Sequence, residues 1–261
     1  MNAAFVEAQL SLFRKSVLKQ SKWRAIRTLL GPTPVRRGLD LGADNGVISH
    51  LLRASGASWS SADMDPVAVE TIRQMVETDV HLTDGRHLSF ADATFDAVVV
   101  IDMLEHVADD AGLIEEIARV LKLGGRLLVN VPHVKRFPLL RPLRLALGLT
   151  DQWHGHLRPG YNRKTLSTLL EDRFVIETWR TYNRFFSELL DILLNYAYRR
   201  KTQSGSGTTK GTIVTAADLQ PGASTLRLYS ILYPAFVAFA ALDGLVPFAG
   251  YSLIVSARKR A

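Results

Sequence analysis

Between residues 35 and 132 the sequence alternates between short apolar segments and longer segments with helical periodicity. The strand-like segments are residues 35–41, 58–64, 80–83, 95–102 and 126–132, and the helix-like segments are residues 46–55, 65–77 and 109–121. Residues 95–102 and 126–132 are nearly continuous apolar runs, as expected for strands that are buried on both faces. The alternation predicts a parallel sheet with helices on both faces.

The segments on either side of this region predict further elements. Residues 5–30 have helical periodicity, which ends at Gly31 and the prolines after it. After Pro132 we expect helices at 162–173, 185–201 and 225–243, strands at 174–182 and 251–258, and a flexible loop at 202–211. Together these elements predict an α/β fold with a Rossmann-like, seven-stranded, mostly parallel sheet. N-terminal helices and an apolar helical insertion before the last strand complete it.

The absence of cysteine excludes structural disulfides and thiolate metal sites. Glu7 interrupts the basic-then-apolar order of a signal peptide near the start of the sequence, so a cytoplasmic protein is expected.

The net charge of +7 is unevenly distributed along the chain. It is +5 over residues 1–30, −8 over 31–132, +7 over 133–201 and +3 over 202–261. The basic flanks are compatible with an anionic partner such as a membrane surface, a phosphorylated substrate or nucleic acid, and also with an ordinary solvated surface.

Two glycines stand at the turn between the first predicted strand and the following helix, in the order Gly42-x-Asp44-x-Gly46. A P-loop needs a lysine after its last glycine, and this turn has none. A dinucleotide-binding turn has glycine in the middle position, where the carboxylate of Asp44 would repel a pyrophosphate. A cofactor with a cationic end and no phosphate suits the turn better.

The segments "LDLGADNG", "SADMDP", "LTDGRHLSF", "ATFDAVVVIDMLEHV" and "LKLGGRLLVNVP" follow one another in the chain. In this order they resemble the class I S-adenosylmethionine-dependent methyltransferases, and most of all the branch of ubiquinone and menaquinone methyltransferases. The resemblance covers about residues 35–180. It implies S-adenosyl-L-methionine as cofactor and a division into N-terminal helices (1–34), a methyltransferase domain (35–184), a helical insertion or lid (185–249) and a last strand (250–261).

The resemblance also implies a set of cofactor-binding residues. They are Asp40, Gly42, Ala43, Asp44, Gly46, Asp63, Met64, Asp84, Gly85 and Asp102. The glycine turn would contact the methionine part, and Asp63 would accept hydrogen bonds from the ribose hydroxyls. Met64 would lie along the adenine and Asp84 would bind its amino group. Asp44 departs from the family pattern, and Asp102 has a helix-capping acid as its alternative interpretation.

His106 and His156 are the candidate catalytic residues, as bases for an oxygen acceptor. His133 and His154 lie in neighbouring segments, and each of these histidines has an ordinary hydrogen-bonded side chain as its alternative. His154 and His156 do not define a metal site without a carboxylate partner, so no metal is predicted.

Asp243 is the one charged residue between Leu228 and Ser256. The uncharged run before it is too short for a membrane span and contains Pro234. The segment suits a core element, a lid over a lipid-like substrate, or peripheral membrane contact through residues 185–249.

The leading hypothesis is therefore a methyltransferase for a small-molecule or lipid-like acceptor such as a quinone, a lipid or a lipid-linked sugar. An RNA or protein methyltransferase is a second hypothesis, although no separate RNA-binding module is present and a nucleic-acid partner is not expected. A third is a non-catalytic adapter that retains the fold and docks to a membrane or partner, and Asp44 keeps this hypothesis open. The sequence predicts no oligomeric state.

Overall fold

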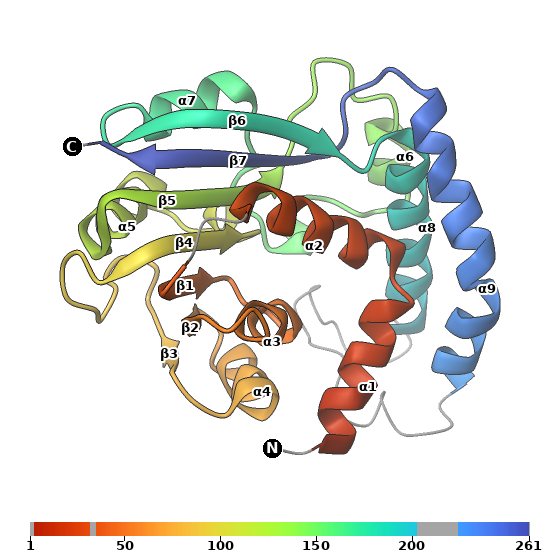
Figure 1. Ribbon diagram of the computed structural model, residues 1–261. Coiled ribbons are helices and arrows are strands. Elements are labelled where there is room, and N and C mark those ends of the chain that lie inside the picture. The colour runs from red at the N-terminus through yellow and green to blue at the C-terminus, as the bar shows by residue number, and fades with distance from the viewer. Residues whose placement is uncertain (1–2, 32–34, 203–223, 261) are drawn as a thin grey trace.

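The structure is a computed structural model that describes residues 3–31, 35–202 and 224–260. Within these residues, seven strands form one central sheet (Figure 1). They are β1 Arg37–Leu41, β2 Ser58–Asp63, β3 Val80–Leu82, β4 Phe95–Ile101, β5 Leu121–Pro132, β6 Phe174–Tyr182 and β7 Ser252–Lys259. Their spatial order is β3-β2-β1-β4-β5-β7-β6.

Strands β1 to β5 pair in parallel, and β7 is antiparallel to both of its neighbours, β5 and β6. The predicted α/β fold with a seven-stranded, mostly parallel sheet is confirmed. The antiparallel pairs arise because β7 is inserted between β5 and β6, which themselves run in the same direction.

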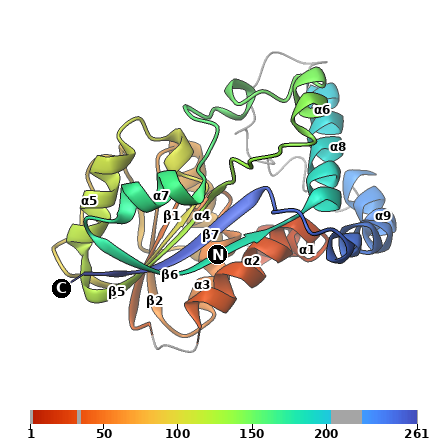
Figure 2. The ribbon, with the colours of Figure 1, turned by 90° about the horizontal axis from the view of Figure 1, so that it is seen from above.

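Helices cover both faces of the sheet. Their bounds are α1 Ala3–Arg14, α2 Val17–Leu30, α3 Val47–Arg53, α4 Pro66–Val76, α5 Asp110–Val120, α6 Arg141–Ala146, α7 Arg163–Leu170, α8 Phe185–Thr202 and α9 Ser224–Ala241. Short 3-10 turns are η1 Leu104–His106, η2 Gln152–His154 and η4 Leu242–Leu245. Seen from above, α5 and α7 lie on one face of the sheet, and α2 and α3 lie on the other (Figure 2).

The alternation of side chains along β4 explains why this strand is apolar throughout. Val98 and Val100 are buried in the cluster that contains residues of α5 and α7. Ala97, Val99 and Ile101 belong to the cluster on the opposite face, with residues of α2 and α3. Successive strand residues point to opposite faces, so a strand that is covered on both sides needs apolar residues at nearly every position.

The N-terminal region forms two helices where the periodicity suggested one unit. The interruption lies at Ser16, whose hydroxyl accepts a hydrogen bond from the amide of Lys19 at 3.3 Å and caps α2. The predicted cap of α7 is confirmed, since Asn162 accepts from the amide of Thr165 at 3.0 Å. Pro66 lies in the first turn of α4, as expected.

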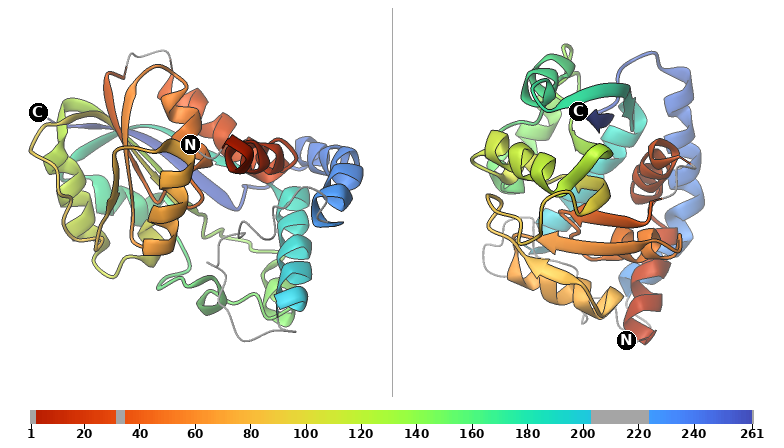
Figure 3. Two further views of the ribbon diagram at one scale, coloured as in Figure 1. Left: turned by 90° about the horizontal axis from the view of Figure 1, so that it is seen from below. Right: turned by 60° about the vertical axis from the view of Figure 1, so that its left-hand side comes forward.

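Helices α6, α8 and α9 lie beyond the end of the sheet at which β6 leads into α8 (Figures 2 and 3). Because β6 runs in the direction of β1 to β5, this is the end where those strands have their carboxyl termini. The predicted helix 225–243 is α9, which continues through Pro234. Of the predicted flexible loop 202–211, residues 203–211 lie outside the described residues. No helix in the described part of the chain has the length and apolarity to cross a membrane.

Candidate functional site

The sequence-predicted site residues converge on the carboxyl ends of the parallel strands. The glycine turn follows β1, Asp63 ends β2, Asp84 follows β3 and Asp102 follows β4. Open α/β sheets bind ligands at this edge, because adjacent loops diverge there and the helix N-termini point toward it. The site therefore lies on the side of the molecule that faces α6 and α8 (Figure 2).

The turn after β1 has an unusual backbone. Gly42, Asp44 and Gly46 all adopt positive φ, at +77°, +48° and +74°. A Cβ on Gly42 would lie 2.3 Å from the carbonyl oxygen of Ile101, so this turn packs directly against the end of β4. Only glycine fits at such a position, because both the left-handed conformation and the close backbone contact exclude a side chain.

Asp44 takes the left-handed conformation that a glycine would have at the middle position, which aspartate tolerates better than most residues. Its side chain is exposed. Its amide donates a hydrogen bond to Oδ2 of Asp63 at 3.1 Å, and the amide of Asp65 donates to Oδ1 at 3.1 Å. The substitution therefore preserves the turn, and the turn fixes the Asp63 carboxylate.

Burial raises the pKa of Asp63 above its ordinary value, and the charge of Asp44 acts in the same direction. The two amides that bind the carboxylate oppose this rise. The neighbouring acid, Asp65, acts differently, because its carboxylate accepts from the amide of Val67 at 2.9 Å and caps α4. Of these two acids, Asp65 caps a helix and Asp63 does not, so Asp63 is the one whose carboxylate can bind a ligand.

Asp40 lies beneath the turn and is fully buried. Its Oδ2 accepts a hydrogen bond from the hydroxyl of Ser49 at 2.5 Å, and burial raises its pKa to about 7. Asp40 therefore connects β1 to α3 from below, and Ala43, which is also buried, fills the turn itself.

The residues predicted to surround the adenine lie together. A Cβ on Gly85 would be 2.7 Å from Sδ of Met64, so the loop after β3 passes directly over the end of β2. Asp84 Oδ1 accepts hydrogen bonds from the amides of His87 at 2.9 Å and Arg86 at 2.8 Å. These amides hold the pKa of the Asp84 carboxyl below its ordinary value.

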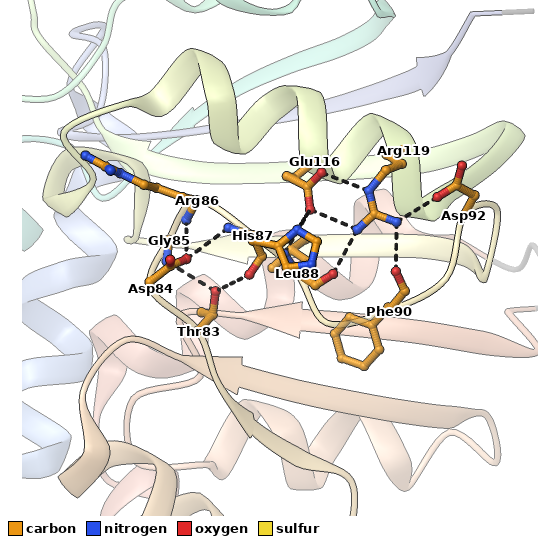
Figure 4. Close-up of polar contacts among 10 residues, drawn as sticks. All are labelled: Thr83, Asp84, Gly85, Arg86, His87, Leu88, Phe90, Asp92, Glu116 and Arg119. Carbon is orange, nitrogen blue, oxygen red and sulfur yellow. Dashed lines mark hydrogen bonds and ion pairs between the residues drawn. The ribbon is translucent and has the colours of Figure 1, made fainter.

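An ion pair on α5 holds this loop in place (Figure 4). Arg119 donates to Glu116 and to the carbonyl oxygens of Leu88 and Phe90, all at 2.8 Å. Glu116 Oε2 in turn accepts from the amide of Leu88 at 2.9 Å. The bonds from Arg119, and then that from Leu88, lower the pKa of Glu116 to about 2.

We expect Glu116→Gln to destabilise the fold by about 2 kcal/mol near neutral pH, because it breaks charge-assisted bonds that are partly shielded from solvent. The folded-state pKa is lowered, so this stability is present above the unfolded-state pKa of ~4.3 and is lost as the pH falls toward 2. Urea denaturation between pH 3 and pH 7 measures it. Asp92→Asn, which removes an exposed partner of the same Arg119, should cost only a few tenths of a kcal/mol. Equal costs for both variants would contradict the assignment.

Asp102 does not cap a helix, since η1 begins at Leu104 and its N-cap residue is Met103, which makes no side-chain capping bond. Its carboxylate instead forms an ion pair with Lys22 of α2 and accepts from Asn130 Nδ2 at 2.7 Å. The hydroxyl of Tyr182 donates to Asn130 Oδ1 at 2.5 Å. Removal from water lowers the pKa of Lys22, but the charge and hydrogen bond of Asp102, together with the charges of Tyr182 and Asp44, outweigh this and raise it. The sequence did not indicate Lys22, because nothing in its helix marks it as a partner of β4.

The two candidate histidines lie together although 50 residues separate them in the chain. Their ring centroids are 4.9 Å apart, edge to face. His106 Nδ1 lies 2.9 Å from the carbonyl oxygen of Gly155. A carbonyl only accepts, so Nδ1 carries the hydrogen and Nε2 of His106 is left as an acceptor. Burial, followed by the neighbouring His106, lowers the pKa of His156 to about 4.

Sequence reasoning missed Glu105, which lies beside both histidines. It is fully buried, and neither carboxylate oxygen has a hydrogen-bond partner within the described residues; the same holds for His156 Nδ1. Burial, and then the charge of Asp102, raises the pKa of Glu105. The ligand atoms of Glu105, His106 and His156 all lie within 4.8 Å of one another, so this set could hold a metal ion. The sequence argument against a metal had considered the His154–His156 pair without a carboxylate.

His133 is not part of this group. Its Nδ1 lies 2.8 Å from the carbonyl oxygen of Gly250, which fixes β5 to the segment before β7. His154 stacks edge to face on Trp153, with centroids 4.7 Å apart.

Comparison with known proteins agrees with this geometry. Residues 39–129 match the family described as "Methyltransferase domain". Over 128 residues the chain is 34% identical to the demethylmenaquinone methyltransferase of Tropheryma whipplei. This match covers 47% of this chain and 53% of the relative. Over 106 residues it is 34% identical to the ubiquinone biosynthesis O-methyltransferase of Xylella fastidiosa. This match covers 38% of this chain and 43% of the relative. The chain thus spans about half the length of the curated relatives it matches.

Solved structures agree on the fold. The N-methyltransferase NodS from Bradyrhizobium japonicum, in complex with S-adenosyl-L-homocysteine, has a TM-score of 0.56 at 13% identity, with all of both chains covered. A SAM-dependent methyltransferase from Archaeoglobus fulgidus has a TM-score of 0.57 at 13% identity, with 92% of this chain and 94% of the other covered. The chain shares the fold of these two methyltransferases. Residues 39–129 match a methyltransferase domain, and the resemblance seen in the sequence is confirmed.

Proposed function

We propose that this protein is an S-adenosylmethionine-dependent methyltransferase that acts on a small or lipid-like acceptor. The observation that carries the proposal is the carboxylate of Asp63, which the amides of Asp44 and Asp65 hold at the carboxyl end of β2, beside the glycine turn. A carboxylate has lone pairs left to accept two further hydrogen bonds, as the adjacent hydroxyls of a ribose require.

The residues around Asp63 fit the remaining parts of this cofactor. The exposed carboxylate of Asp44 suits a cationic end and disfavours a phosphate. Met64 and Gly85 lie together where the adenine would rest, with Asp84 beside them. Asp102 and Lys22 present opposite charges toward the same edge of the sheet, which suits an amino-acid end that carries both charges. When bound, S-adenosylmethionine supplies a methyl group on a sulfonium, so alignment of the acceptor accounts for much of the rate.

His156 and His106 are the proposed proton acceptors. A His156 pKa of about 4 means that this ring is neutral at physiological pH, so one of its nitrogens can accept a proton, although the lowered pKa also makes it a weaker base than an ordinary histidine. The bond from His106 Nδ1 to Gly155 leaves Nε2 of His106 as the basic nitrogen. Both residues lie where the 150–157 loop packs on η1, through the amide of Leu157 and the carbonyl oxygen of Glu105 at 2.8 Å.

A lipid-like acceptor, of which a quinone is one example, agrees with two observations. The relatives named above carry names of quinone-pathway methyltransferases. Residues 185–249, which the sequence analysis considered as a lid or a membrane contact, expose large apolar side chains in the described structure. These are Leu193, Ile231, Leu232, Val237, Leu242, Leu245 and Phe248.

Neither alternative function gains support from a specific observation. The adapter hypothesis rested on Asp44, but Asp44 adopts the backbone conformation of the glycine it replaces and binds Asp63 through its amide. The RNA or protein methyltransferase hypothesis rested on the basic flanks, whereas the site edge itself is rich in carboxylates.

Calorimetric titration with S-adenosylmethionine and S-adenosylhomocysteine tests the proposal. We expect micromolar dissociation constants, which correspond to roughly −8 kcal/mol. ATP is the control, because its phosphates should be repelled by Asp44, and we expect no measurable heat from it. If neither S-adenosylmethionine nor S-adenosylhomocysteine binds, the enzyme proposal is wrong. If they bind, quinone and lipid acceptors can be screened.

A further inference from the structure

We propose that residues 136–145, the segment formed by the loop before α6 and most of α6 itself, dock the protein onto an anionic lipid bilayer. Four large apolar side chains in these ten residues are exposed: Phe137 at 71%, Leu139 at 56%, Leu143 at 39% and Leu145 at 47%. Such a density of exposed apolar side chains in one short segment is unusual on a soluble surface and marks an interaction site.

The opposite side of this segment is anchored to the protein. Leu140, in the middle of the segment, is buried with Leu149 and Ile192 of α8. Arg199 of α8 donates to the carbonyl oxygen of Leu147 at 2.6 Å. An ion pair between Lys135 and Glu188 fixes its beginning to α8. The exposed apolar side chains therefore belong to a segment that is held against α8, so the segment can enter an interface without unfolding.

The charge of residues 136–145 indicates which kind of partner binds this segment. Arg136 and Arg141 are exposed between the apolar residues. The sequence has no acidic residue from 117 through 150, so nothing in the segment neutralises them. The guanidinium of Arg136 lies 5.3 Å from the ring centroid of Phe137, which leaves cation and ring side by side at the surface. Bulky apolar residues alternating with uncompensated arginines match the boundary between headgroups and acyl chains in an anionic leaflet.

The position of residues 136–145 gives docking a consequence for the site. Residues 146–149 separate this segment from the 150–157 loop, which carries His156 and packs on Glu105 through Leu157. Docking at residues 136–145 would therefore bring the histidine side of the site toward the bilayer. The docking itself does not require methyl transfer, so it stands or falls independently of the proposed function.

Sedimentation with vesicles tests the inference on the full chain. We expect binding to vesicles of equal parts phosphatidylglycerol and phosphatidylcholine, and much weaker binding to pure phosphatidylcholine. Phe137→Ser with Leu139→Ser should reduce partitioning at least about tenfold. Arg136→Ala and Arg141→Ala should each reduce partitioning about fivefold at low salt. The reduction should be smaller at high salt, because salt screens the attraction between the arginines and the anionic lipid.

Matched variants elsewhere on the surface serve as controls. Leu123 is about as exposed as Phe137, at 69%. It lies at the beginning of β5, at the end of the sheet opposite to the candidate site, so Leu123→Ser should leave partitioning unchanged. Arg27→Ala on α2 controls for general loss of charge. Binding that survives the Phe137–Leu139 double variant, or that is lost instead in Ile231→Ser with Leu245→Ser, would overturn the assignment, as would no binding by the wild type. Titration of each variant with S-adenosylhomocysteine verifies that the cofactor site is intact.

Discussion

Asp63→Ala is expected to weaken the binding of S-adenosylmethionine and S-adenosylhomocysteine at least about 100-fold. The carboxylate would make two charge-assisted hydrogen bonds to the ribose, each worth roughly 1.5–3 kcal/mol, and alanine replaces neither. Folding should be little affected, because the carboxylate is only partly buried and its lost bonds come from the amides of Asp44 and Asp65, which lie near water. Calorimetric titration of wild type and variant measures the ratio directly.

Asp65→Asn is the matched control, since it changes a carboxylate two residues away and asparagine also caps helices well. We expect cofactor affinity within about threefold of wild type. If Asp65→Asn lost affinity while Asp63→Ala retained it, the two acids would have exchanged roles. Equal loss in both variants would mean that the net charge of this edge of the sheet, and not the geometry of Asp63, governs binding.

The sheet could be predicted because its sequence signals are local. Apolar runs such as residues 95–102 leave no alternative to a strand covered on both faces, and Pro66 and Asn162 mark the starts of their helices. The insertion of β7 between β5 and β6 could not be derived in this way, since strand order depends on packing between distant segments. The break at Ser16 was missed because apolar periodicity continues across it while the capping bond decides the boundary.

The candidate site divides in the same way. Residues that directly follow strands, such as Asp63 and Asp84, are placed by the parallel sheet, and the sequence was sufficient to bring them to one edge. Contacts made by residues on other elements could not be predicted from the sequence. Lys22 on α2, for example, forms an ion pair with Asp102. Glu105 was overlooked because its burial follows from the 150–157 loop, which packs over η1. The sequence named His106 and His156 as separate candidates and did not predict that their rings lie together, and their proton-accepting role stays a prediction.

Gly42→Ala is expected to destabilise the fold by at least about 3 kcal/mol and to abolish cofactor binding in the fraction that folds. Two costs combine: a φ of +77° is strained for alanine, at roughly 1 kcal/mol, and the new Cβ would lie 2.3 Å from the carbonyl oxygen of Ile101. That oxygen belongs to the backbone at the end of β4 and cannot rotate away as a side chain would. The turn must therefore shift, and Asp63 loses the amide of Asp44 that positions it.

Gly124→Ala separates the two costs, because Gly124 has a similar φ of +69° but no atom within 4 Å of an added Cβ. It should lose only about 1 kcal/mol, from backbone strain alone, and bind S-adenosylhomocysteine as the wild type does. Urea denaturation of both variants gives the difference, which measures the close contact between the glycine turn and β4. Similar losses at the two positions would mean that the turn can move away from Ile101, and the packing argument for Gly42 would then fail. Cofactor affinity measured on the same samples would show whether such a movement also displaces Asp63, since a turn that relaxes without loss of binding does not hold that carboxylate in place.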